Sequence, residues 1–168
     1  MAVEEAALIR SILYATDLGL YAPYVVQHAL TLARSFKAEL YVVHAVEPIG
    51  VLADSLLQTY VEPDQLKALR DQGLKSVLVN IEKRVMECFK EELDDGQEDL
   101  ALIKTVRALM GDPPDVILKE ATALNVDLIV IGTRSHGAEE NAPIGRTAQR
   151  LLQTSRVPIY AVPLLQHR

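Results

Sequence analysis

Several features that would place this protein outside the cytoplasm are missing from its sequence. It has a single cysteine, Cys88, in 168 residues, so no disulfide can form within the chain. No apolar run approaches the ~20 residues that a membrane-spanning helix needs. The first residues include Glu4 and Glu5 and lack the basic start of a secretory signal peptide. Together these absences predict a cytoplasmic protein without a membrane span.

Positive charge is also scarce. The chain has 17 Lys and Arg residues against 23 Asp and Glu residues, a net charge of −6, and its basic residues form no cluster. We therefore expect no nucleic-acid partner, because a duplex would be repelled. The same net charge disfavours small anions, so a phosphate site in this protein has to rely on local groups.

Common catalytic motifs are absent as well. The sequence has neither the Gly-Lys-Ser/Thr loop of a P-loop NTPase nor the Gly-x-Ser-x-Gly turn of an α/β-hydrolase. Its histidines, His28, His44, His136 and His167, lack the spacing of metal ligands. Asp17 lacks the acidic neighbours that a receiver-type phosphoacceptor needs. We expect no metal site and no dedicated catalysis.

What remains is typical of a globular chain. Apolar residues make up 49% of the sequence and charged residues 24%. At this length, folding should bury roughly 70% of the surface of the unfolded chain. We predict a single domain over residues 1–168, with its core at about 10–163.

Apolar runs alternate with helical periodicity along the chain. The runs that read as strands are residues 11–16, 40–46, 100–110, 127–131 and 157–163. The third run is interrupted by Lys104 and Arg107, so we place it at an edge of the sheet. Stretches with apolar residues three or four apart separate the strands. This alternation predicts a doubly wound parallel α/β sheet with helices on both faces.

Two connecting stretches have weaker patterns. Residues 49–61 are expected to be irregular, although a short helix or a flap over the sheet edge is compatible with them. Residues 63–89 read as one long helix that could break at Gly73. Asp112 is expected to cap the helix that follows the third strand, with Pro113 in its first turn.

A polar, glycine-bearing loop follows the fourth strand. It starts at Gly132 and leads into a helix that begins near Gly145. The N–H groups at a helix start are unpaired, and the helix dipole favours negative charge there. Asp17 ends the first strand, so both features lie at the carboxyl edge of the sheet, where ligands bind in open α/β folds. The pattern predicts a phosphate site if the first and fourth strands are neighbours.

Four stretches together carry a family signature: Ile12-Leu-Tyr-Ala-Thr-Asp17, Val42-Val-His-Ala-Val46, Gly111-Asp-Pro113 and Asp127-Leu-Ile-Val-Ile-Gly-Thr133. On these stretches the chain resembles the universal stress protein family. The resemblance implies a five-stranded, Rossmann-like sheet of order 3-2-1-4-5, of the adenine nucleotide alpha hydrolase type. It also implies a homodimer formed through the fifth strand, between Val157 and Val162. The family includes members that bind ATP.

Nucleotide-binding members carry the motif Gly, two residues, Gly, nine residues, Gly, then Ser or Thr. Gly132 and Gly145 match its first and last glycines, whereas Ser135 replaces the middle glycine. Arg146 replaces the Ser or Thr, and Thr147 follows it. The Cβ of Ser135 can disturb a tight phosphate turn, but the guanidinium of Arg146 can pair with phosphate in a forked geometry. The sequence leaves two alternatives open: the loop still binds a nucleotide, or it has lost this ligand.

The sheet-edge pattern and the resemblance together select one set of site residues. They are Ala15, Thr16, Asp17, Ala45, Gly132, Arg134, Ser135, Gly145, Arg146 and Thr147. The implied ligand is ATP or AMP, with Mg²⁺ as a further candidate and at most weak ATP hydrolysis. The expected role is a stress sensor or regulator. Nucleotide binding is expected to order loop 134–144, together with the flap at 49–61 if one forms, and so to alter a surface that an unknown regulatory protein recognises. The alternative is a dimeric interaction or scaffold protein without a small ligand.

Overall fold

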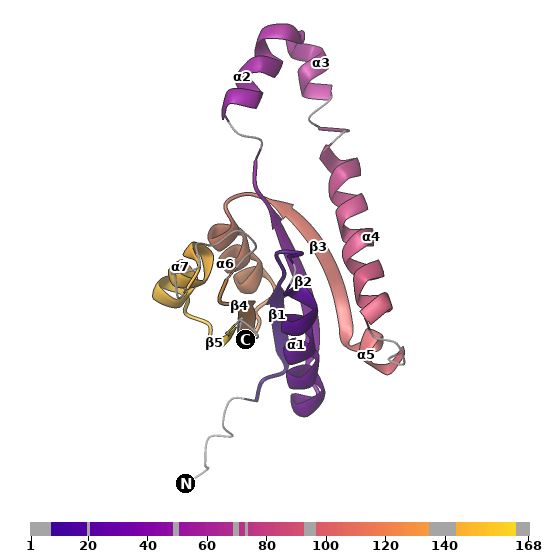
Figure 1. The fold of residues 1–168 in the computed structure, drawn as a ribbon, viewed down its shortest axis with the longest axis vertical. Coiled ribbons are helices and arrows are strands. Elements are labelled where there is room, and N and C mark those ends of the chain that lie inside the picture. The colour runs from indigo at the N-terminus through magenta and orange to yellow at the C-terminus, as the bar shows by residue number, and fades with distance from the viewer. Residues whose placement is uncertain are drawn as a thin grey trace, which may run out of the picture.

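The computed structural model describes residues 8–19, 21–48, 51–68, 71–72, 74–92, 97–134 and 144–163. The strands in these ranges are β1 Ser11–Ala15, β2 Glu39–Val46, β3 Ile103–Met110, β4 Leu128–Gly132 and β5 Ile159–Val162. They form one sheet of order β3-β2-β1-β4-β5 in which every pair is parallel (Figure 1). The predicted sheet order and the adjacency of the first and fourth strands are confirmed.

Helices cover both faces of the sheet, as predicted. Those in the described ranges are α1 Ala22–Phe36, α2 Val51–Tyr60, α3 Pro63–Ala68, α4 Leu74–Glu92, α5 Gln97–Leu102, α6 Pro113–Ala123 and α7 Arg146–Thr154. Buried residues of α1 and α4 pack on one face, and buried residues of α6 and α7 pack on the other. None of these helices is long and apolar enough to cross a membrane.

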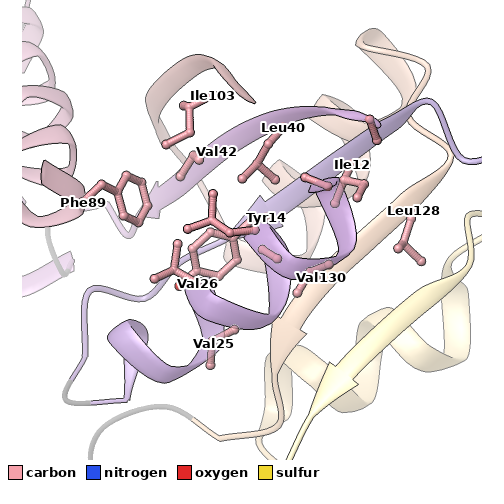
Figure 2. Packing of buried hydrophobic residues seen from close by; sticks show 14 of the residues in the cluster. Ile12, Tyr14, Val25, Val26, Leu40, Val42, Phe89, Ile103, Leu128 and Val130 are labelled. Atoms are coloured by element: carbon pink, nitrogen blue, oxygen red, sulfur yellow. The ribbon is translucent and has the colours of Figure 1, made fainter. Parts of the chain in front are cut away.

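The core follows the two-residue period of the central strands. In β1, Ile12 and Tyr14 join the cluster on the α1 face, whereas Leu13 joins the cluster on the α6 face. Figure 2 shows the first cluster, in which Tyr14 lies between α1 and the ring of Phe89 from α4. Because both faces of β1 and β4 are covered, their sequences read as unbroken apolar runs.

The chain between β2 and β3 differs from the main expectation in two places. The segment expected to be irregular forms α2, the short helix that the sequence also allowed, and the long helix is interrupted between Ala68 and Leu74, which divides it into α3 and α4. Pro63 explains the boundary between α2 and α3, since proline fits a first helical turn but cannot continue a preceding helix. Gly73, the suggested break, lies outside the described residues. Figure 1 shows α2 and α3 projecting beyond the sheet.

The third strand is an edge strand, as predicted, but it begins at Ile103 rather than at residue 100. The preceding residues close α5, whose first turn holds Glu98 and Asp99, where acidic side chains suit the helix dipole. Asp99 also forms an ion pair with Arg34 of α1. Lys104 and Arg107, which marked this strand as an edge, are both paired, with Glu39 and Glu120 respectively.

Candidate functional site

A cleft of about 520 Å³ opens at the carboxyl edge of the sheet. The chain leaves β1 toward α1 on one face and leaves β4 toward α7 on the other. The two strands are neighbours, so their following loops diverge and leave a crevice between them. The predicted site residues that line the cleft are Ala15, Thr16, Asp17, Ala45, Gly132, Arg134, Gly145, Arg146 and Thr147. Ser135 lies outside the described residues, as does the rest of loop 135–143.

The loop after β1 is held by its own side chains. The Leu18 N–H donates to Thr16 Oγ1 at 3.1 Å, and the Gly19 N–H donates to Asp17 Oδ1 at 2.8 Å. Leu18 has a φ of 57°, a left-handed conformation that a residue with a Cβ adopts only under constraint. A Cβ on Gly19 would lie 3.0 Å from Asp17 Oδ2. Glycine at position 19 therefore lets the Asp17 carboxylate fold back over the turn.

The β4 side of the cleft ends at the start of α7. The Gly145 N–H donates to the Thr133 carbonyl at 2.6 Å, and the first helical bond runs from the Gln149 N–H to the Gly145 carbonyl. Gly145 is the N-cap residue and carries no side-chain acceptor. The backbone N–H groups of Arg146 and Thr147, at the first helical positions, are therefore not bonded within the helix.

The two motif glycines, Gly132 and Gly145, differ in whether the structure requires glycine at that position. Gly145 has φ −70° and ψ 159°, an extended conformation open to any residue, so its backbone does not require glycine. Gly132 matters through packing, because a Cβ there would lie 3.3 Å from Val25 Cγ2 of α1. The first motif glycine thus lets α1 approach the end of β4.

His44 links two neighbouring strands of the sheet. Its Nδ1 donates to the Thr16 carbonyl at 2.8 Å, which joins the ends of β1 and β2. His44 also lines the cleft, as does Glu47 just beyond β2. Sequence reasoning missed Glu47, although a polar residue after a buried strand was the signal that selected Asp17.

Charges in the cleft are separated along the sheet edge. Asp17 and Glu47 follow β1 and β2, whereas Arg134 and Arg146 follow β4 and begin α7. Apolar side chains also line the cleft; they include Val25, Ala45, Ile117 and Ile131. Within the described ranges, no group of three or more His, Cys, Asp or Glu side chains is placed to hold a metal ion. The cleft therefore suits an elongated ligand with an anionic end and a hydrogen-bond-donating end.

Two comparisons with known proteins point to the same family. The model of the universal stress protein family matches residues 9–163. A universal stress protein of Thermus aquaticus, from the QAH/OAS sulfhydrylase 3′ region, is 30% identical over 156 residues and aligns over 92% of this chain and 99% of its own length.

Two solved structures illustrate the shared fold. Hypothetical protein MJ0577 has a TM-score of 0.69 at 20% identity, covering 95% of this chain and 99% of that one. A universal stress protein in complex with cAMP has a TM-score of 0.56 at 16% identity, covering 94% and 98%. These two likenesses confirm the predicted architecture.

Proposed function

Because the chain belongs to the universal stress protein family, we propose that it binds an adenine nucleotide in the cleft and acts as a sensor or regulator without dedicated catalysis. The observation that carries this proposal is the separation of charge across the cleft, with carboxylates at one end and arginines at the other. A nucleotide has the matching polarity, since its phosphates are anionic while its ribose and amino group donate hydrogen bonds.

Each part of the ligand has a place in this arrangement. The N–H groups of Arg146 and Thr147, with the guanidinium groups of Arg134 and Arg146, take the phosphates. Asp17 and Glu47 accept hydrogen bonds from the ribose hydroxyls or the adenine amino group. The apolar lining packs against the base, with Ala45 among its members. A volume of about 520 Å³ lies in the usual range for small-molecule pockets, roughly 300–1,000 Å³.

The nucleotide we propose is ATP or AMP. A structural relative of this fold is known in complex with cAMP, which supports an adenine nucleotide as the ligand class. Mg²⁺ would enter with ATP and be held mainly by phosphate oxygens, since Mg²⁺ bound to nucleotides takes only one or two protein carboxylates. Its contribution would be to offset phosphate charge in a chain whose net charge is −6.

The direct test is titration calorimetry of the purified protein with ATP and Mg²⁺, AMP and cAMP. We expect saturable heat with one site per chain for ATP or AMP, and weaker binding at higher salt because phosphate contacts are screened. GTP serves as the control for the base end of the cleft. No heat at millimolar adenine nucleotide would exclude the proposed ligand class.

A second candidate function is a dimeric scaffold without a small ligand. It is favoured by one observation: Arg146, which replaces the motif Ser or Thr, already pairs with Asp112 of the chain itself. A protein of this kind would give no calorimetric signal with any nucleotide. Its partner-binding surface would be the same with and without added nucleotide.

We also propose a homodimer through β5. The two edges of the sheet differ, because α4 packs along β3 and Glu82 Oε1 of α4 accepts the Ala108 N–H at 2.9 Å. At the other edge, alternate carbonyls of Pro158 and Val162 bond inward to β4. Parallel pairing therefore turns the N–H and C=O groups of Ile159 and Ala161 outward. An open edge of this kind is a template for pairing with a second chain.

Light scattering at micromolar concentration should give twice the chain mass of 18.6 kDa. Ala161→Pro removes one outward N–H and leaves the inward ladder to β4 intact, so this variant should be monomeric. Ala161→Ser keeps the N–H and should remain dimeric. A monomeric wild-type protein would refute pairing through β5.

A further inference from the structure

Four charged side chains link the starts of α6 and α7 beside the cleft. Asp112 immediately precedes α6 and Asp115 lies in its first turn, whereas Arg146 and Arg150 belong to α7; we call these four residues the clasp. Arg146 Nη2 lies 3.4 Å from Asp112 Oδ1, and Arg150 Nη1 lies 3.3 Å from Asp112 Oδ2. Arg150 Nη2 also lies 3.2 Å from Asp115 Oδ1. Asp112 therefore holds two cations at once.

The carboxylate of Asp112 is available for this pairing because it does not cap its own helix. Asp112 occupies the N-cap position of α6, as the sequence predicts, but its side chain makes no capping hydrogen bond. Pro113 and Pro114 fill the first two helical positions and have no N–H to donate. The expected capping bond is absent, and the carboxylate pairs with the arginines instead.

The two arginines are held unequally. Arg150 contacts both Asp112 and Asp115, whereas Arg146 contacts Asp112 alone. Arg146 has the longest contact of the clasp, its side chain is 80% exposed, and it also lines the cleft. Exposed ion pairs of this kind are weak. Arg146 can therefore exchange Asp112 for another anion at little cost, while Asp112 keeps Arg150 as its partner.

We propose that Asp112 competes with the phosphate of the ligand for Arg146 and thereby lowers the preference of the cleft for phosphorylated over unphosphorylated adenine compounds. This inference rests on the proposed function. In the free protein, the Asp112 carboxylate pairs with Nη2 of the Arg146 guanidinium. A bound phosphate offers that guanidinium a forked pair and more negative charge, so it withdraws Arg146 from the clasp. Asp112 is thus a specificity-determining residue outside the cleft lining.

Calorimetry with ATP and with adenosine on matched variants tests this competition. Asp112→Asn should raise ATP affinity about threefold to fivefold, because Arg146 is released to the ligand. Adenosine has no phosphate, so its affinity should not change. Asp115→Asn is the matched control: it removes the same charge from the same cluster but leaves the partner of Arg146 in place. Its effect on ATP should be about 1.5-fold or less.

A double-mutant cycle identifies the route of the effect. Arg146→Gln should lower the ratio of ATP affinity to adenosine affinity about tenfold. In the Arg146→Gln background, Asp112→Asn should add nothing. Equal gains for Asp112→Asn and Asp115→Asn, or a gain that persists without Arg146, would overturn the competition while leaving nucleotide binding in place. Failure of the wild-type protein to bind either compound would overturn the proposed function itself, and this inference with it.

Discussion

Gly145→Glu is expected to abolish nucleotide binding while leaving the protein folded. The substitution places a carboxylate at the start of α7, where the proposed phosphates meet the N–H groups of Arg146 and Thr147. Like charges in such contact cost several kcal/mol, so ATP affinity should fall by about a hundredfold or more. The new carboxylate is also attracted to the positive end of the helix dipole and so competes with the phosphate for it.

Folding should tolerate this change for reasons visible at the same residue. The φ of −70° and ψ of 159° at Gly145 are accessible to glutamate, and a negative charge at a helix start is favourable. The unfolding temperature of Gly145→Glu should therefore stay close to that of the wild type. Gly145→Ala adds a Cβ without charge and should keep most of the ATP affinity. If Gly145→Glu binds ATP as well as the wild type does, the phosphates do not lie at α7.

The sheet could be predicted from the sequence because its central strands are buried on both faces. Residues 128–131 have to be apolar in every position, and a short unbroken run of this kind has few alternatives to a parallel strand. The adjacency of β1 and β4 came from the family resemblance, and the polar ends of these strands then located the cleft. The strand positions and most of the lining were therefore predictable.

The region between β2 and β3 could not be predicted equally well. Tyr60 of α2 is 82% exposed and Leu56 is 53% exposed, so apolar residues there do not mark a buried face. A helix that projects from the sheet lacks the one-sided pattern on which periodicity depends. The start of β3 was misplaced for a related reason, since Leu100 and Leu102 pack against the core from α5 rather than from a strand.

Within the site, contacts between residues far apart in the chain could not be predicted from the sequence. Asp112 and Arg146 lie 34 positions apart, and no local pattern relates them. The contact between Gly132 and Val25 is of the same kind, because it depends on how closely α1 packs on the end of β4. Motif spacing located Gly132 and Arg146, but only the packing of α1, α6 and α7 shows what each one contacts.

Leu151→Ala is expected to lower the free energy of unfolding by about 2–5 kcal/mol, the usual range for truncating a fully buried leucine. The side chain of Leu151 is 0% exposed and packs in the cluster on the α6 face. Among the described residues of α7, only Ala148 is buried with it. Leu151 therefore provides most of the apolar contact that holds α7, and with it the phosphate end of the cleft, against the sheet.

The neighbouring residue supplies a matched control. Leu152 is 47% exposed, so Leu152→Ala removes the same atoms from the same helix at a solvated position. Its effect on stability should be within about 0.5 kcal/mol. Urea unfolding with an unchanged m value measures both variants on one scale. ATP affinity should fall only for Leu151→Ala, because a loosened α7 no longer holds the N–H groups of Arg146 and Thr147 in one position. Equal losses of stability in the two variants would show that burial of Leu151 does not fix α7.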